Sequence, residues 1–185
     1  MLVPIIVLIV VVAIPVFLYN ALVGKKNQVS NVFASIDTLL KKRYNLIPNL
    51  ISTVKTYMQH EKGVLTEITE TRAKALSGGI SDDEKVQLDN KMSKALGGIM
   101  VAVENYPNLK ANQNFLQLQA AFNEIEEQIS AARRAYNATV TDYNNAVEMF
   151  PTNIMASMMN YKNKTLFEIS EKERKNVDAG KLFKG

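Results

Sequence analysis

The hydrophobic positions of this chain follow two patterns, one continuous and one periodic. Residues 1–23, MLVPIIVLIVVVAIPVFLYNALV, contain no ionisable side chain. As a helix, residues 2–23 would rise roughly 33 Å, enough to cross a bilayer hydrocarbon core of about 30 Å. From Val29 onward, apolar residues recur at helical spacing among polar ones. The patterns predict a membrane anchor, residues 1–24, followed by a helical bundle, residues 25–160.

The first two bundle helices are expected at 29–44 and 46–76. Pro48 separates them, because proline lacks a backbone N–H and disfavours the α conformation in the residue before it. A kinked continuous helix is the alternative, since Ile47 and Leu50 stay in phase with the apolar positions that precede them.

The third and fourth helices have clear ends. Ser77-Gly78-Gly79 stops the second helix, and Ser81-Asp82-Asp83-Glu84 is a capping box that begins the third, which runs to Pro107. The fourth is expected from Ala111 or Asn112 to Phe150, before Pro151. Composition turns polar after Tyr161, and we expect fraying there.

The fourth helix carries an apolar series that steps by three and four residues. Such a series is typical of a heptad seam between helices. Its members are Phe115, Leu118, Phe122, Ile125, Ile129, Ala132, Tyr136, Thr139, Tyr143, Ala146 and Phe150. The fold class is therefore all-α: one transmembrane helix, an antiparallel four-helix bundle, a short C-terminal helix and a polar, partly ordered tail, residues 161–185. The fourth helix is longer than the third can cover, and this uncovered seam predicts a homo-oligomer.

The seam also bears on the repeat Tyr136-Asn137 and Tyr143-Asn144, which could otherwise suggest a binding site. Both tyrosines occupy seam positions, so we interpret them as buried core residues whose hydroxyl groups need partners. Asn137 and Asn144 lie one step off the seam and are interpreted as structural hydrogen-bonding residues that fix register.

Two acids, Asp37 and Glu61, lie on or beside apolar stripes. A carboxylate in such a position needs a partner, and the available cations are Arg43, Arg72 and Arg133. We interpret each acid as one member of a buried ion pair, and Arg133 as a structural residue. A catalytic acid is the alternative reading.

Motifs for other chemistry are missing from the sequence. It has no Gly-x-Gly-x-x-Gly, Walker or Gly-x-Ser-x-Gly motif, no cysteine, and one histidine, His60, which we interpret as a structural or surface residue. No catalytic residue, cofactor or metal site is therefore predicted.

The distribution of charge along the chain argues against nucleic-acid binding. The net charge is +4, but the last 25 residues hold seven Lys/Arg against four Asp/Glu, and the remaining 160 carry 15 against 14. A nucleic-acid-binding domain should have a basic folded face. The basic tail could instead contact anionic lipid headgroups.

Residues 152–161, TNIMASMMNY, form a short apolar segment with Met155, Met158 and Met159. Because methionine packs on irregular surfaces, the segment could cap the bundle, contact a partner or lie on the membrane.

Basic residues set the expected orientation. None precedes the apolar run, whereas Lys25 and Lys26 follow it at once. The positive-inside rule then places the bundle in the cytoplasm and the N-terminus outside. A cleaved signal peptide would need a basic stretch before the apolar run, so a retained anchor in the bilayer through residues 2–23 is preferred.

Several stretches resemble the LemA family of bacterial membrane proteins. They are "YNALV", "NQVSNVFASIDTLLKKRYNLIPNLISTVKTYMQHE", "ENYPNLKANQNFLQLQ", "IEEQISAARRAYNATVTDYNNAVEMFP" and a closing "FE". The resemblance implies a membrane-anchored helical bundle in a bacterial inner membrane and supplies no reaction, cofactor or catalytic residue. Phe33 stands where relatives have a Trp-like residue, and the chain ends in "NVDAGKLFKG" where relatives are more hydrophobic.

Three functions remain open from the sequence. The first is a non-enzymatic scaffold that self-assembles at the membrane and organises partners. The second is a membrane-surface or signalling adaptor acting through the methionine-rich segment and the basic tail. The third is an enzyme using Glu61 or Asp37.

Overall fold

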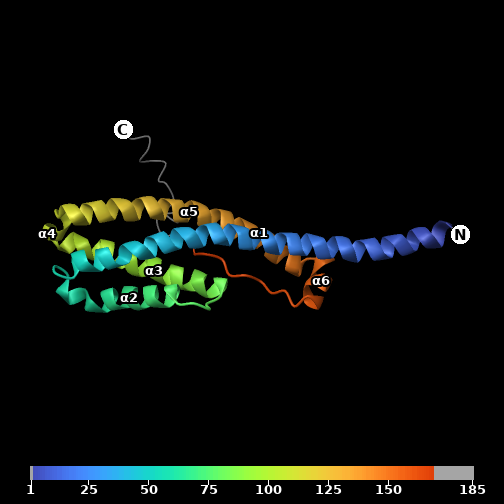
Figure 1. Ribbon diagram of the computed structural model, residues 1–185, viewed down its shortest axis with the longest axis horizontal. Helices are drawn as coiled ribbons and strands as arrows, with labels where there is room; N and C mark the ends of the chain where they lie inside the picture. The colour runs from blue at the N-terminus through green and yellow to red at the C-terminus, as the bar shows by residue number, and fades with distance from the viewer. Residues whose placement is uncertain (1, 169–185) are drawn as a thin grey trace, which may run out of the picture.

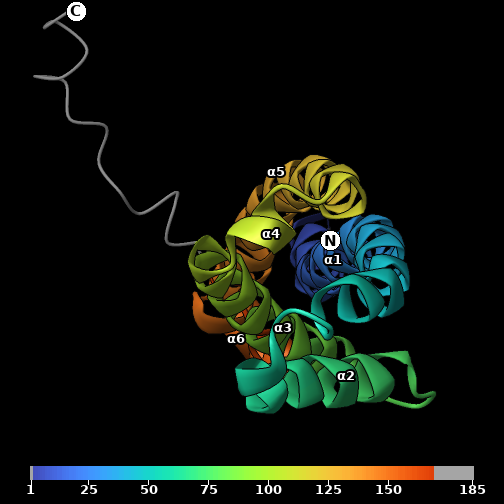
Figure 2. The same cartoon turned by 90° about the vertical axis from the view of Figure 1, so that its left-hand side faces the viewer.

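The computed structural model describes residues 2–168, and all of their regular secondary structure is helical. This confirms the all-α class. The elements are α1 (Leu2–Val54), a 3₁₀ turn η1 (Gln59–Glu61), α2 (Lys62–Leu76), α3 (Asp82–Ala102), a 3₁₀ turn η2 (Val103–Asn105), α4 (Pro107–Lys110), α5 (Gln113–Glu148) and α6 (Thr152–Met158). Figure 1 shows an elongated molecule in which the first part of α1 projects beyond the bundle. The four long helices, α1, α2, α3 and α5, are seen end-on in Figure 2.

Helix α1 joins the apolar segment to the bundle without a break, so the predicted end near Tyr44 and new start near Leu46 are wrong. The continuous helix, the alternative reading, is the one observed, with Pro48 inside it. Proline at 48 cannot donate to the carbonyl of Tyr44, four residues earlier. Arg72 of α2 replaces that donor: its Nε lies 2.8 Å from the Tyr44 carbonyl oxygen. The chain turns after Val54 instead, and α2 begins at Lys62.

The projecting part of α1 is long and apolar enough to cross a membrane, the only such helix within residues 2–168. Its apolar side chains, among them Leu8, Val12 and Phe17, are exposed. Exposure ends at Leu22, which is fully buried.

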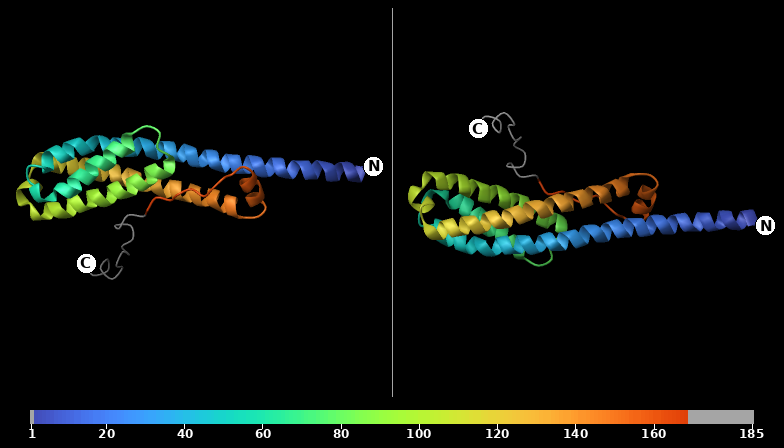
Figure 3. Two further views of the ribbon diagram at one scale, coloured as in Figure 1. Left: turned by 90° about the horizontal axis from the view of Figure 1, so that it is seen from below. Right: turned by 90° about the horizontal axis from the view of Figure 1, so that it is seen from above.

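Helices α1 and α5 pack antiparallel along most of the bundle (Figure 3). Two contacts fix their register. The rings of Phe33 and Tyr136 lie 5.6 Å apart. Arg43, ten residues later on α1, pairs with Glu126, ten residues earlier on α5. The same register places the end of α5, at Glu148, opposite the part of α1 that precedes Leu22.

The core of α1 has heptad spacing, and two positions of the predicted seam of α5 are displaced by one residue. In α1 the buried apolar positions alternate steps of four and three, broken only by Arg43: Val29, Phe33, Ile36, Leu40, Ile47, Leu50 and Val54. In α5, Phe115, Phe122, Ile129, Tyr136 and Tyr143 are buried as predicted. Between them, however, Arg133 and Val140 are buried, where Ala132 and Thr139 were expected.

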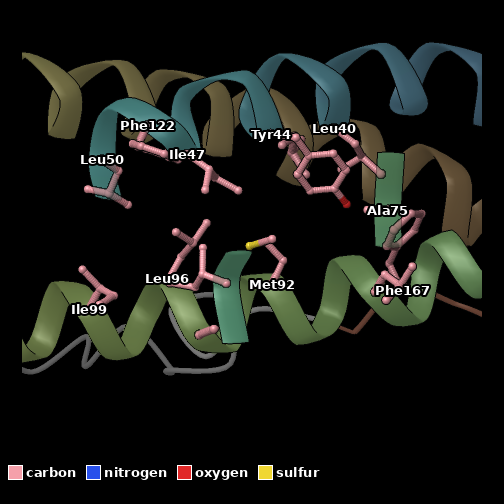
Figure 4. Close-up of a cluster of buried hydrophobic side chains, with 14 of the residues drawn as sticks. Leu40, Tyr44, Ile47, Leu50, Ala75, Met92, Leu96, Ile99, Phe122 and Phe167 are labelled. Carbon is pink, nitrogen blue, oxygen red and sulfur yellow. The ribbon is translucent and has the colours of Figure 1, made fainter. Parts of the chain in front are cut away.

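The central core lies where α1, α3 and α5 meet. Figure 4 shows Tyr44, Ile47 and Leu50 of α1 facing Met92, Leu96 and Ile99 of α3, with Phe122 of α5 nearby. Burying each large apolar side chain stabilises the fold by roughly 1.5–3 kcal/mol. Helix α3 begins with the predicted capping box: Ser81 Oγ accepts from the Glu84 N–H at 3.2 Å, and a Glu84 carboxylate oxygen accepts from the Ser81 N–H at 3.0 Å.

Helices α2 and α3 are shorter than α1 and α5 and cover only the half of the bundle far from the projecting helix (Figure 1). The other half is covered by α6 and by residues 161–168, an extended segment that runs back along the bundle (Figure 3). We call residues 161–168 the strap. The predicted fraying after Tyr161 is therefore wrong for the strap, and residues 169–185 of the predicted tail lie outside the described residues. Because α6 and the strap cover this half of the seam, the seam itself no longer argues for a second molecule.

Candidate functional site

Three places in the molecule hold groups that could carry function. They are a buried group of charges at the centre of the bundle, a row of polar side chains on α3 and α5 that binds the strap, and an exposed apolar surface around α6.

The central charges are those of Arg43 on α1, Asp89 on α3, and Glu126 and Arg133 on α5. We call these four residues the charge cluster. Arg43 and Asp89 are fully buried, Arg133 is nearly so, and the Glu126 side chain is 41% exposed. Each arginine replaces an apolar residue at a core position of its helix.

Each acid of the charge cluster bridges both arginines. Asp89 pairs with Nη2 of Arg43, and its other oxygen lies 2.5 Å from Nη2 of Arg133. Glu126 lies 2.7 Å from Nη1 of Arg43 and 3.3 Å from Nη1 of Arg133. The hydroxyl of Ser93 accepts from Arg43 at 3.0 Å and from Arg133 at 2.7 Å.

The charge cluster is neutral as a whole, with two positive and two negative groups. Burial lowers the pKa of Arg43, and the nearby Glu126 carboxylate opposes that shift. Burying charges is tolerated only when they are paired and hydrogen-bonded, which is the arrangement here. The cluster joins three helices and holds no reactive nucleophile, so its geometry fits a structural role that fixes helix register.

Polar side chains of α3 and α5 bind the main chain of the strap. Asn144 makes two bonds to Lys164, accepting from its N–H at 2.9 Å and donating to its carbonyl at 3.0 Å. Asn137 makes the same pair of bonds to Phe167, both at 2.9 Å. From α3, Asp83 accepts from the N–H of Thr165 at 2.8 Å.

Asn90 of α3 completes the set, accepting from the N–H of Glu168 at 3.1 Å. We call Asp83, Asn90, Asn137 and Asn144 the polar ladder. On each helix its two members stand seven residues apart, which is a rise of about 10.5 Å. Their targets on the strap are three residues apart, about 10 Å in an extended chain. Seven residues of a helix and three residues of an extended chain therefore have nearly the same length. This match explains why the two asparagines of the Tyr-Asn repeat stand seven residues apart.

Phe167 is the buried side chain of the strap. It is 2% exposed, and its ring meets the Tyr136 ring edge-on with centroids 5.1 Å apart. The Arg133 guanidinium lies 5.6 Å from the Phe167 ring centre, so the strap contacts the charge cluster. At its other end, the rings of Tyr161 and Tyr143 lie 6.4 Å apart, and Lys26 Nζ is 4.8 Å from the Tyr161 ring centre.

Both tyrosines of the repeat are core residues. Burial raises the pKa of Tyr136 and of Tyr143. The hydroxyl of Tyr136 is buried and has no hydrogen-bond partner within residues 2–168, contrary to the expectation that a buried tyrosine would find one.

The two acids singled out from the sequence lie elsewhere. Asp37 is half-exposed and pairs with Lys85 at 2.9 Å. Glu61 lies partly exposed in η1, and no ion pair joins it to a cation of the described chain. Neither is a buried ion pair, because the available arginines are used by Asp89, Glu126 and the Tyr44 carbonyl. His60 is exposed.

Sequence reasoning missed Asp89, although a signal for it exists. It lies between the buried Val86 and Met92 on the apolar stripe of α3, the same kind of position that drew attention to Asp37. Its buried arginine partners come from α1 and α5, far along the sequence.

The apolar surface around α6 is wider than the three methionines named from the sequence. Met158 is 77% exposed, but Met155 and Met159 are partly buried. Met149, Phe150 and Ile154 are more exposed than either of these two, and Phe150 reaches 78%. We call Met149, Phe150, Ile154 and Met158 the apolar foot. The register of α1 and α5 places it level with the end of the exposed apolar part of α1.

The described surface also has a depression of about 390 Å³ between α1 and α5, lined mainly by polar residues such as Asn49, Asn114 and Gln117. Tyr136, Tyr143 and Glu61 do not line it. Within residues 2–168, no three His, Cys, Asp or Glu side chains gather as they would around a metal ion.

The fold and these sites define an elongated antiparallel helical bundle with a long apolar N-terminal helix and its own C-terminal segment docked on it. The chain belongs to the LemA family, whose family model matches residues 32–179. Among similar proteins is Protein LemA of Metamycoplasma hominis, 28% identical over 88% of this chain and 74% of that protein.

The more distant relatives include magnetosome proteins. Magnetosome protein MamQ 2 of Paramagnetospirillum magneticum is 20% identical over 81% of this chain and 64% of its own length. Magnetosome protein MamQ of Magnetospirillum gryphiswaldense is 20% identical over 78% of this chain and 62% of its own length. The chain thus spans less than two thirds of these magnetosome proteins.

Proposed function

We propose that this protein is a non-enzymatic scaffold, anchored in the bacterial inner membrane through residues 2–23, whose bundle stands on the cytoplasmic face, self-assembles and organises partners or the membrane. One observation carries the proposal: α1 runs from the apolar segment into the bundle core as a single helix. A continuous helix transmits position and orientation, whereas a flexible linker would let the bundle tumble. Such a rigid connection suits a scaffold that keeps its partners at a fixed position relative to the membrane.

The apolar foot supports contact with the lipid surface. It lies beside α1 at the level where the exposed apolar side chains give way to buried ones. Amphipathic segments in this position insert their apolar side chains about 5–10 Å into the interface. Lys25 and Lys26 follow the apolar stretch at the same level, where they would meet anionic headgroups.

Insertion of the foot can be tested with single tryptophans, because the chain contains none. The full-length Phe150→Trp variant is reconstituted in vesicles with brominated acyl chains, which quench tryptophan within the bilayer. Strong quenching is expected. The matched control is Val101→Trp, on a side chain 73% exposed at the end of α3, and it should be quenched little. Equal, weak quenching of both variants would rule out the membrane-facing foot.

The orientation is tested with cysteines, which the chain also lacks. A membrane-impermeant maleimide added to spheroplasts should label Asn114→Cys only after lysis and label a cysteine placed before the anchor at once. The reverse pattern would put the bundle outside.

Self-assembly is tested by light scattering of the detergent-solubilised full-length protein. We expect a mass well above that of the 20.7 kDa chain. A clean monomer at micromolar concentration would remove self-assembly from the proposal while leaving the anchored bundle.

A second candidate is a membrane-surface adaptor, favoured by the exposure of Phe150 and Met158. In that case the foot would bind a partner or the membrane, and the bundle would act as a spacer. Binding of residues 25–185 to anionic vesicles, lost on Phe150→Ser and Met158→Ser without any change in the oligomeric mass of the full-length protein, would favour the adaptor. An enzyme would instead need its acids: a cellular phenotype that disappears in the Asp37→Asn, Glu61→Gln variant with unchanged thermal stability would contradict the non-enzymatic proposal.

A further inference from the structure

The strap brings two lysines to the end of the bundle from which α1 projects. Its first residues follow α6 and run beside the end of α5 (Figure 3). The side chain of Asn163 donates a hydrogen bond to the carboxylate of Glu148, the last residue of α5. Asn144, four residues earlier on α5, holds both main-chain groups of Lys164. These bonds fix Lys162 and Lys164, on either side of Asn163, beside the C-terminal end of α5.

Two lysines of α1 lie at the same level. Lys26 Nζ lies 4.8 Å from the centre of the Tyr161 ring, and that ring lies 6.4 Å from the ring of Tyr143 on α5. The exposed apolar part of α1 ends at Leu22, and Lys26 stands about 6 Å beyond it along the helix. Lys25 directly precedes Lys26. We call Lys25, Lys26, Lys162 and Lys164 the lysine collar.

The lysine collar is accessible to an anion from outside the chain. Two of its members are exposed, two are partly exposed, and no ion pair joins any of them to an acid within residues 2–168. Among the nearby acids, Glu148 is bonded to Asn163. Asp83, which accepts from the N–H of Thr165, stands further from Leu22 than Lys164 does. The lysines are therefore the charges that stand closest to the level at which the apolar surface ends.

We propose that the lysine collar binds the headgroups of anionic phospholipids, and that the docked strap supplies half of this site. The inference rests on the proposed function, in which the apolar foot enters the lipid interface, and it names the class of lipid beside the foot. Each lysine close to an anionic membrane surface strengthens binding by a factor of about five. The attraction is screened beyond about 8 Å at physiological ionic strength, a distance that matches the spacing between Leu22 and Lys26.

Docking of the strap decides where half of these charges stand. Successive side chains of an extended chain point to opposite faces. Because Phe167 is buried, the even-numbered residues Lys162 and Lys164 belong to the outward face of the strap. A side chain on a fixed main chain loses less conformational freedom on binding than one on a free segment. Release of the strap should therefore weaken the site although no charge is lost.

The lipids that surround the apolar foot test the proposal. The full-length Phe150→Trp variant, in which this tryptophan is the only one, is reconstituted at low salt in equimolar phosphatidylglycerol and phosphatidylcholine. One preparation has brominated acyl chains on phosphatidylglycerol, and the other has them on phosphatidylcholine. The ratio of tryptophan quenching in the two preparations measures the selectivity for the anionic lipid. We expect a ratio above one that falls toward one in about 1 M salt, where the screening length is about 3 Å.

The charges of the strap are tested by Lys162→Gln with Lys164→Gln. This variant should lower the selectivity by a factor of about three or more. The matched control is Lys91→Gln with Lys110→Gln, which also removes two exposed lysines. These lie on α3 and α4, away from the projecting part of α1 (Figure 1), and their loss should leave the selectivity unchanged.

The docking of the strap is tested without any change of charge. Asn137→Ala, Asn144→Ala and Phe167→Ala together remove four of the six hydrogen bonds of the polar ladder and the buried ring. The selectivity should fall about as far as in the lysine variant. The control is Leu166→Ala, on a side chain that is 44% exposed, and it should keep the full selectivity.

Release of the strap is verified in the same proteins by cross-linking. Lys94→Cys and Glu168→Cys are added to one chain, because the natural side chains pair at 2.8 Å and the natural chain has no cysteine. A short bis-maleimide should join them while the strap is docked and fail to join them once it is released.

Each outcome supports or overturns the proposal. Equal quenching by the two brominated lipids would overturn it, as would a selectivity that the lysine variant and its control lower alike. A selectivity that survives release of the strap would show that the strap does not build the site. Strong, equal quenching by both lipids leaves the apolar foot in the membrane and removes only the lysine collar, whereas quenching as weak as that of Val101→Trp means that the foot and the collar fail together.

Discussion

The bond from Arg72 to the Tyr44 carbonyl predicts a specific dependence on Pro48. The Arg72→Met variant keeps much of the side chain's length and loses the donor at 2.8 Å. Tyr44 is a buried residue, so its carbonyl is left without a partner at a cost of about 1–3 kcal/mol. In the Pro48→Ala background, the new N–H at position 48 can donate to the same carbonyl inside the helix.

Arg72→Met should therefore cost clearly less when residue 48 is alanine. The expected coupling in the double-mutant cycle is about 1–2 kcal/mol, larger than the roughly 0.5 kcal/mol within which independent sites add. A control in the same helix is Lys74→Met, an exposed side chain, expected to change stability by no more than about 0.5 kcal/mol.

The assay is urea unfolding of the four full-length proteins in detergent, followed by circular dichroism at one protein concentration. Free energies come from the linear dependence on urea, with a common slope for all variants. If Arg72→Met costs the same in both backgrounds, Arg72 stabilises the protein in some other way, and the explanation of the unbroken helix is wrong.

Three further outcomes follow from buried polar groups. Asp89→Asn should destabilise the bundle by about 3–5 kcal/mol, because it leaves two buried arginines with one half-exposed acid. The matched control Asp37→Asn, on a half-exposed side chain, should cost at most about 1 kcal/mol. Similar losses for the two variants in denaturant unfolding would refute the role of the charge cluster. Tyr136→Phe should leave stability unchanged or raise it, since it removes a buried hydroxyl without a partner in the described chain, and a loss above about 1 kcal/mol would contradict this. Burial raises the pKa values of Tyr44, Tyr136 and Tyr143; a raised folded-state pKa gives stability that is complete below about pH 10 and falls as pH rises further. In a pH titration, the tyrosinate absorbance of these residues should appear together with the loss of helical circular dichroism. Full ionisation of all tyrosines near pH 10 with the helices intact would disprove the link between their burial and stability.

Much of the fold was predictable from local signals. The apolar run before Val23, the capping box at Ser81 and the heptad positions from Phe115 to Tyr143 each depend on residues close together in the chain. Local geometry and burial of one helix face are enough to specify such elements.

The predictions from sequence were wrong where a residue far along the chain changes the stability of a local structure. Pro48 was expected to end a helix, because the donor that compensates for it, Arg72, lies 24 positions further along and on another helix. Ala132 was placed in the seam instead of Arg133, since an arginine is a poor core residue until Asp89 supplies its partner. The prediction that Asp37 and Glu61 are buried was wrong for the same reason: no arginine within residues 2–168 pairs with either of them.

The sequence by itself determined that this chain is helical, where most helices begin and end, and that Tyr136 and Tyr143 face a core, because periodicity and breakers act over a few residues. The tertiary structure decided which charges are buried and what Asn137 and Asn144 bind. Those outcomes depend on groups brought together from α1, α3, α5 and the strap, and the free energy of a buried polar group is set by its partner rather than by its neighbours in the chain.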